Sequence, residues 1–270
     1  MKKESNFQLK FGKVIIAVIL LIIIISVFYV PYDINLINGD EKLFSPSIRH
    51  ILGTDNLGRD VFSRVIAGTR FTFIVSVLTV LFSSVIGTVL GMFSGYSHYI
   101  VDEIIMRIID AISSFPGILL ALVLVSVMNK QKYTIILALS VIFIPSFTRI
   151  SRNETLKCRN EEYIRSAQVF GASKLRILFV HMLPNIMTSL MPSIVIGLSK
   201  SILAESSMSY LGLGIQPPYP SWGRMLFESQ PYLFNAPWCA LSPGLMIMIT
   251  VIGFNYIGDG LSQKYVYNME

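Results

Sequence analysis

Charged side chains are scarce in this sequence, and their scarcity excludes an ordinary water-soluble globular protein. Asp, Glu, Lys and Arg make up 14% of the 270 residues, whereas hydrophobic residues make up 53%. A soluble domain typically carries about 25% charged residues, so most of this chain cannot face water. Cysteine and histidine are also rare, and Cys158, His50, His98 and His181 are too scattered along the sequence to predict a metal cluster.

Motifs of nucleotide-dependent and hydrolytic enzymes are lacking as well. The sequence contains no P-loop, no G-x-S-x-G, no H-E-x-x-H and no complete G-x-G-x-x-G pattern. We therefore expect no catalytic residues in this chain, no metal site and no bound cofactor. If ATP drives its activity, ATP and Mg²⁺ must bind to a separate ATPase subunit. The net charge of +6 does not predict nucleic-acid binding, because no basic stripe with interleaved aromatics lies outside the apolar runs.

Long apolar runs are what the sequence does have. A hydrocarbon core of roughly 30 Å requires about 20 mostly apolar helical residues. Continuous hydrophobicity, rather than alternation, favours helices over the strands of a membrane barrel. We predict an all-α polytopic membrane protein with six transmembrane helices, over residues 14–30, 71–96, 111–128, 133–148, 186–211 and 239–258.

The distribution of Lys and Arg predicts the orientation in the lipid bilayer. More of them lie in the inner segments when the N-terminus is placed inside, so both termini are expected in the cytoplasm. The first run is followed by "VFYVPYD", which lacks a small-residue cleavage site, so we expect a retained anchor in the cell membrane. We divide the chain into an anchor helix with an outer loop, 1–70, and a core membrane domain of five helices, 71–270.

A polar and basic segment, "EEYIRSAQVFGASKLRILFVHMLPN", interrupts the apolar runs at residues 161–185. Tyr163, Ala167 and Phe170 share one face at helical spacing, which predicts a short amphipathic helix. Gly171 follows where helices commonly end in a left-handed residue. The segment is therefore expected to form a helix, a glycine corner with positive φ, and a second helix that leads into the fifth apolar run.

This segment resembles the cytoplasmic signature of permease subunits of ABC importers. That signature reads Glu-Ala-Ala, three residues, Gly, nine residues, Ile, any residue, Leu-Pro. The matching positions here are Ala167, Gly171, Leu183 and Pro184, and the positions that differ are Arg165, Ser166 and His181. The form found here, "YIRSAQVFGASKLRILFVHMLPN", looks like the version used by the dipeptide, oligopeptide and nickel branch of the family.

Three further segments resemble that branch in the expected order. They are "HILGTDNLGRDVFSRVIAGTR" at 50–70, "MRIIDAISSFP" at 106–116 and "ILAESSMSYLGLGIQPPYPSWGRML" at 202–226. The resemblance implies a type I ABC importer permease fold, with a second homologous permease, two cytoplasmic ATPase subunits and an extracellular or periplasmic substrate-binding protein as partners. The expected function is a permease subunit that forms half of a translocation pathway for short peptides. A nickel or metal-chelate importer of the same family and an ion-coupled secondary transporter are the alternatives.

Two sets of candidate site residues follow. The resemblance implies that loop 152–185 couples to the ATPase through Glu162, Tyr163, Arg165, Ala167, Gly171, Ala172, Leu183 and Pro184; the alternative is an ordinary amphipathic loop. In the fifth run, a small and polar set spans an arc of roughly 140° at 100° per residue: Ser193, Gly197, Lys200, Ser201, Ala204 and Glu205. Because charges are costly at membrane depth, these residues are expected to line the pathway or to form an interhelical ion pair.

Smaller patterns predict packing and ion pairs. Gly87, Gly91 and Gly95 recur every four residues, which is typical of close packing between membrane helices. Arg107 and Asp110 lie one helical turn apart and are expected to pair. Four charged residues on the outer side are expected either to bind the substrate-binding protein or to pair among themselves: Asp55, Arg59, Asp60 and Arg64.

Overall fold

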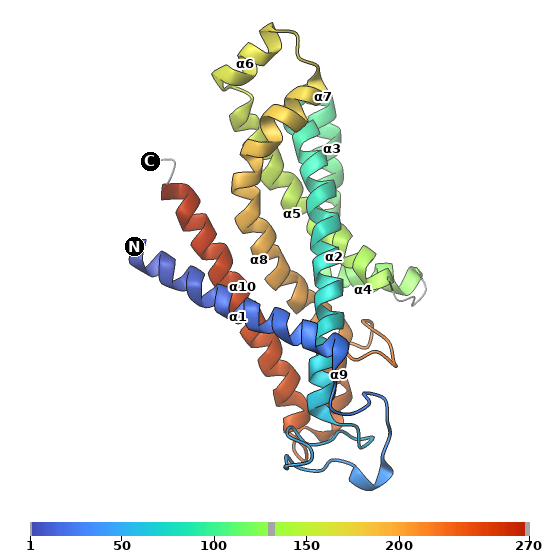
Figure 1. Cartoon of the computed structure of the whole chain (residues 1–270). Helices are drawn as coiled ribbons and strands as arrows, with labels where there is room; N and C mark the ends of the chain where they lie inside the picture. Colours follow the sequence, from blue (N-terminus) through green and yellow to red (C-terminus); the bar gives the residue numbers. More distant parts are fainter. Residues whose placement is uncertain (1, 129–132, 268–270) are drawn as a thin grey trace.

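Five long helices dominate the computed structural model, which describes residues 2–128 and 133–267 (Figure 1). Each is long and apolar enough to cross a membrane. They are α1 (Lys2–Phe28), α2 (Val61–Tyr96), α5 (Thr134–Cys158), α8 (Leu183–Tyr210) and α10 (Trp238–Tyr267). The all-helical membrane fold predicted from the apolar runs is therefore confirmed.

The third predicted span is wrong as a single helix. The chain instead forms α3 (Tyr99–Ser113) and α4 (Gly117–Val127), which meet at an angle of 89°. Pro116 lies at the bend as the N-cap of α4. Proline has no backbone N–H and disfavours helical backbone at the preceding residue, which explains the break. The bent pair counts as one broken crossing or as none, so the described part of the chain contains five or six segments long and apolar enough to cross a membrane. The loop predicted after this span, residues 129–132, lies outside the described residues.

Glycines bring α2 and α5 into close contact at the centre of the molecule. A Cβ added at Gly87 would lie 2.6 Å from Cβ of Phe147, and one at Gly95 would lie 2.8 Å from the carbonyl oxygen of Arg152. Only hydrogen at these positions allows the two backbones to approach so closely. The packing role predicted for the four-residue glycine repeat is therefore confirmed.

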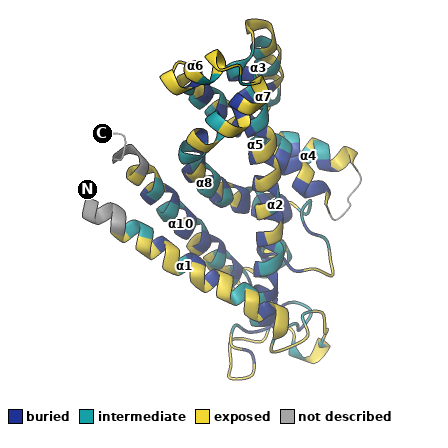
Figure 2. Cartoon of the chain, turned by 45° about the horizontal axis from the view of Figure 1, so that its top comes forward, coloured by how far each residue is buried: buried dark blue, intermediate teal, exposed yellow. Residues whose placement is uncertain are grey.

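α1 packs along α10 and leaves its other face open. A Cβ at Gly253 of α10 would lie 2.7 Å from Ile15 of α1, while the opposite face of α1 is aliphatic and exposed (Figure 2). Such a face suits the hydrocarbon of a bilayer. α2 begins at Val61, so the boundary drawn at 70/71 falls inside this helix. Asp60 caps α2 by accepting a hydrogen bond from the backbone N–H of Ser63 at 2.7 Å.

The two ends of the bundle differ in construction. At one end lie the loop before α2, with η1 (Gly39–Glu41), and the segment with α9 (Trp222–Ser229) and η3 (Gln230–Tyr232). At the other end lie α6 (Glu162–Val169), α7 (Lys174–Arg176) and the π-helical turn η2 (Ile177–Met182) (Figure 1). We call these the cap end and the loop end.

Candidate functional site

The loop end has the predicted sequence of helix, glycine corner and helix. Gly171 follows α6 with a φ of +76°, and its N–H donates to the carbonyl of Gln168 at 3.0 Å. Ser173 caps α7, since its hydroxyl accepts a hydrogen bond from the backbone N–H of Arg176 at 3.3 Å. The chain then passes through η2 directly into Leu183 and Pro184, the first residues of α8, so that α7, η2 and α8 form one continuous helical segment.

The face by which this segment packs is only partly the face read from the sequence, since Ala167 packs but Phe170 does not. Ile164 is the buried anchor of α6, and it packs in one cluster with Ile177, Leu178 and Met182. Phe170, expected on the packed face with Tyr163 and Ala167, is instead 89% exposed. The reason is that α6 ends at Val169, so Phe170 leaves the helix as its C-cap. A helical projection does not apply to a residue beyond the helix end.

Several apolar side chains at the loop end are therefore open to solvent. Val169 is 86% exposed, and Figure 2 shows α6 as one of the more exposed helices. We define the apolar tip as the exposed side chains Val169, Phe170, Leu175, Phe179 and Val180. Charged groups flank it, since Glu162 and Arg165 are exposed on α6. Ala167 and Ala172 lie partly buried behind the tip, against the cluster around Ile164.

Hydrogen bonds connect α6 to two membrane helices. The Nδ2 group of Asn185, in the first turn of α8, donates to the hydroxyl oxygen of Tyr163 at 2.6 Å. Gln168 donates to the hydroxyl oxygen of Tyr96, the last residue of α2, at 3.2 Å. Burial, together with nearby Cys158, raises the pKa of the Tyr163 phenol, so its hydroxyl stays neutral. A displacement of α6 would therefore pull on the ends of both α8 and α2.

The candidate pathway residues of α8 divide into packed and open positions. Gly197 lies against the ring of Phe147, and the Ser201 hydroxyl donates to the carbonyl of Ser76 at 3.4 Å. Glu205 is fully buried and accepts a hydrogen bond from Ser209 at 2.6 Å. Lys200 is exposed and Ser193 is half-buried. The single stripe expected over 140° is split because neighbouring helices cover part of that arc.

A mixed, partly polar face of α8 is exposed or half-buried along its length, and Figure 1 shows α8 with α5 and α10 as its neighbours. We define the α8 open face as Asn185, Ser189, Ser193, Ile196, Lys200, Leu203 and Ser207, which recur at spacings of three and four residues and are exposed or half-buried. Its first half forms the floor of an open groove of ≈ 720 Å³, which residues of α5, α6 and α10 complete. Glu154 of α5 accepts hydrogen bonds there from Ser189 at 3.2 Å and from Lys157 at 2.7 Å.

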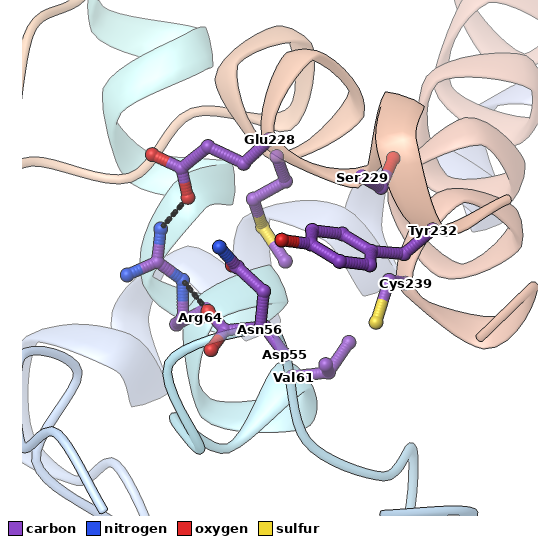
Figure 3. A pocket seen from close by; sticks show the side chains of 9 residues that line it. Asp55, Asn56, Val61, Arg64, Glu228, Ser229, Tyr232 and Cys239 are labelled. Atoms are coloured by element: carbon purple, nitrogen blue, oxygen red, sulfur yellow. Dashed lines mark hydrogen bonds and ion pairs between the residues drawn. The ribbon is translucent and has the colours of Figure 1, made fainter. Parts of the chain in front are cut away.

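Charged residues at the cap end are paired with one another. The guanidinium of Arg64 lies 2.9 Å from Glu228 and 3.6 Å from Asp55, as Figure 3 shows. Arg59 contacts the same two carboxylates, each at 2.7 Å. The cavity beside them has a volume of only ≈ 10 Å³, about the space of one water molecule. Of the two interpretations of these outer charges, pairing within the chain is the one that the structure supports.

Contacts of His50 with Asp60 and Glu41 link the outer loop to the start of α2 at the cap end. Asp60, which caps α2, also contacts Nδ1 of His50 at 2.8 Å, and Nε2 of His50 lies 3.4 Å from Glu41. Burial by itself would raise the pKa of Glu228, but the nearby guanidinium groups of Arg64 and Arg59 outweigh it and hold this pKa below its usual range. All four predicted charges thus serve to fix the outer loop to α2 and α9.

The ion pair predicted between Arg107 and Asp110 is wrong. Arg107 pairs with Glu103 at 2.5 Å, and Asp110 pairs with Arg149 of α5 at 2.8 Å. α5 extends beyond its apolar window and so brings Arg149 beside α3, where it competes for Asp110. A second α3–α5 pair, Asp102 with Arg152 at 2.5 Å, repeats the arrangement.

Sequence reasoning missed several residues that shape these sites. Ile164 is the anchor of α6, Asn185 links α6 to α8, and Glu228 holds the two outer arginines. Ile164 had a readable signal, because it is an aliphatic residue that lies about 160° around the helix from Glu162 and about 100° from Arg165. Asn185 and Glu228 had none, since their partners are distant in the sequence.

Comparison with known proteins covers most of the chain. Residues 87–266 match the family described as "Binding-protein-dependent transport system inner membrane component". The sequence is 42% identical over 235 residues to the glutathione transport system permease protein GsiD of Pectobacterium atrosepticum, covering 87% of this chain and 78% of that protein. It is 36% identical over 267 residues to the dipeptide transport system permease protein DppC of Alkalihalophilus pseudofirmus, covering 96% and 87%.

A solved structure has a similar fold. A chain of the MetNI methionine ABC transporter, in an inward-facing conformation, aligns with a TM-score of 0.63 and 17% sequence identity. The alignment covers 75% of this chain and 96% of that one. At this level of identity the likeness concerns the fold alone.

Proposed function

We propose that this chain carries short peptides. The proposal starts from its family: the chain belongs to the binding-protein-dependent transport system inner membrane components and is an ABC importer permease. Relatives named for dipeptide and glutathione transport support this substrate class, because glutathione is itself a short peptide. Family membership excludes the ion-coupled secondary transporter. No contact among the described residues favours the nickel or metal-chelate alternative.

The apolar tip is the observation that carries the mechanism. Apolar side chains grouped at a protein surface commonly mark a binding interface. In this proposal a cytoplasmic ATPase subunit covers the tip, and loop 152–185 is the coupling loop. Gly171 keeps the corner free of a side chain. Beyond the adjacent residues, no atom of this chain lies within 4 Å of the position where a Cβ would stand, so this space is open to a partner. The exposed Glu162 and Arg165 flank the contact.

Movement would pass from the tip to the membrane through Tyr163. Closure of the ATPase displaces α6, and the hydrogen bond from Asn185 to Tyr163 transmits this displacement to the first turn of α8. Ala172, Leu183 and Pro184 form the connection between the corner and α8. ATP and Mg²⁺ are bound and ATP is hydrolysed on two ATPase subunits, and this chain contributes no catalytic group.

The α8 open face is the part of the pathway that this chain supplies. Ser193 and Lys200 face the pathway, whereas Gly197, Ser201 and Glu205 hold α8 against its neighbours from behind. A second homologous permease completes the wall, and a substrate-binding protein delivers substrate at the cap end. The loop end and both termini lie in the cytoplasm.

Purification of the tagged chain from its native membrane tests this function. We expect mass spectrometry to find a second permease, an ATPase and a substrate-binding protein with it, and we expect the purified assembly, reconstituted in vesicles with ATP, to take up labelled dipeptide. Co-purification without any ATPase would contradict the coupling role. Uptake of a nickel chelate but not of dipeptide would contradict the peptide assignment.

A further inference from the structure

Lys200 is an exposed cation within a membrane-spanning helix. It lies ten residues before Tyr210, the end of α8, which at 1.5 Å per residue places it about 15 Å from that end. Helical side chains lean toward the helix N-terminus, and α8 begins at the loop end. The ammonium group therefore leans into the membrane and away from the nearer, cap-end surface.

No residue in the described parts of the chain neutralises this cation. Lys200 is absent from the ion pairs and hydrogen bonds formed by the side chains of residues 7–128 and 133–264. Glu205, which sequence spacing offered as a partner, is fully buried on another side of α8 and accepts from Ser209. An unpaired charge at this depth is too costly to face hydrocarbon, so the α8 open face must face water or a partner group.

The face around Lys200 is mixed and has a polar component. Ile196 and Leu203 lie about one turn before and after it, Ser193 and Ser207 lie about two turns before and after it, and the groove that begins at the loop end runs toward it along α8. The exposed face of α1, by contrast, is built of aliphatic side chains such as Leu21 and Ile24. The chain thus separates a face suited to lipid from one suited to a solvated solute.

We propose that Lys200 binds the carboxylate of the transported peptide as it passes along α8. This inference rests on the proposed function. Every unmodified peptide carries a terminal carboxylate at neutral pH, whatever its side chains, so one fixed cation can serve many sequences. A single ammonium forms a charge-assisted hydrogen bond with a carboxylate. Surrounding water and hydroxyls keep that contact weak enough for release, as conduction through a pathway requires.

The test compares a dipeptide with its C-terminal amide. Uptake is measured in vesicles that contain the complete importer, with both substrates at concentrations that saturate the binding protein. The permeases are wild type, Lys200→Met, Lys200→Arg, and the control Lys264→Met, which removes an exposed charge near the end of α10. Since the same binding protein serves every variant, its own preference cancels when acid-to-amide ratios are compared.

We expect Lys200→Met to lower the uptake of the free acid roughly 10-fold relative to the amide, the change that corresponds to one charged hydrogen bond. Lys200→Arg and Lys264→Met should keep the wild-type ratio. An unchanged ratio in Lys200→Met would overturn the proposal. An equal loss for acid and amide would also overturn it, and would assign Lys200 to an ion pair with the second permease. A wild-type importer that transports neither dipeptide nor amide would instead overturn the proposed function.

Discussion

The charge cluster around Arg64 at the cap end and the apolar tip at the loop end differ in whether this chain supplies partners for their side chains, although the cap end also exposes single apolar residues such as Ile48 and Phe234. At the cap end, charged groups are drawn inward and paired, so that the Arg64 side chain is only 3% exposed between Glu228 and Asp55. At the loop end, apolar groups point outward, and Val169 and Phe170 contact little of the chain. The buried charges around Arg64 have partners within this chain, whereas the exposed side chains of Val169 and Phe170 have few contacts within it.

This difference shows that the charge cluster at the cap end is complete by itself, whereas the apolar tip is not. The cap end satisfies its polar groups within one chain, so it forms a rigid attachment of the outer loop to α2 and α9. The loop end leaves apolar area uncovered, which costs free energy in water unless a partner covers it. We therefore expect substitutions at the cap end to change the stability of this chain, and substitutions at the apolar tip to change only its association.

The largest effect is expected for Arg64→Met. Removing one partner from a buried ion pair leaves carboxylates without full compensation, which should lower the free energy of unfolding by about 3 kcal/mol. The two tryptophans of the chain report on this end, since Trp222 and Trp238 donate to the carbonyls of Val65 and Thr54. Thermal unfolding in detergent, followed by tryptophan fluorescence, measures the change. Arg70→Met is the control, and equal stability of the two variants would contradict the account.

A smaller effect is expected for Phe170→Ser, and it should appear in a different measurement. Truncating an anchor residue of an interface costs about 2 kcal/mol, or roughly a 30-fold loss of ATPase affinity. The unfolding transition should stay at the wild-type temperature, because Phe170 packs on little of its own chain. Phe234→Ser, at a fully exposed position of the cap end, is the matched control. A lower unfolding temperature of Phe170→Ser with unchanged affinity for the ATPase would show that Phe170 stabilises this chain and does not bind a partner.

Glycines with positive φ offer a paired comparison of the two ends. Gly171→Ala should cost about 1 kcal/mol for backbone conformation alone, because an added Cβ meets nothing within 4 Å. Gly58→Ala, also at positive φ, would in addition press against the backbone oxygen of Asn38 and should cost more. Hydrogen exchange at the loop end and tryptophan fluorescence at the cap end would report the two changes. Equal costs would show that the cap end is less tightly packed than described.

The smallest effect concerns pH. The pKa of Glu228 is held below its usual range in the folded chain, so this carboxylate adds stability above its unfolded pKa of roughly 4.3, and that stability is lost as pH falls through the lower folded value. Glu228→Gln should therefore be less stable than wild type at neutral pH. The gap should narrow as the pH is lowered from about 6 to about 3. A gap that widens on acidification would contradict this charge assignment.

Local patterns predicted local structure well. The glycine corner at Gly171 and the close packing at Gly87 follow from backbone rules that depend on a few neighbouring residues, and both appear as predicted. Long apolar windows likewise gave the membrane helices, because hydrophobicity is a property of the segment itself. The bend at Pro116 was missed because the search for runs free of charged residues does not treat proline as an interruption.

Pairings between distant segments could not be predicted in the same way. Arg64 lay outside the apolar run predicted over 71–96, yet it lies inside α2, where Glu228, 164 residues away, balances its charge. Lys200 and Glu205 fall within the single polar arc that the spacing predicted. In the structure, α8 packs against α2 and α5 through Ser201 and Gly197, which leaves Lys200 exposed and Glu205 buried. Which face of a helix is covered depends on its neighbours, and the spacing of its own residues does not reveal it.

Photo-crosslinking tests whether the apolar tip is the surface that the ATPase binds. A benzophenone derivative of phenylalanine replaces Phe170 in one variant and Phe234 in another, and both are irradiated in native membranes. Because both side chains are nearly or fully exposed, the two positions differ mainly in the end of the molecule they report. We expect a crosslink to the ATPase subunit from position 170 and none from position 234. An ATPase crosslink from 234, or none from 170 while the importer is intact, would contradict it.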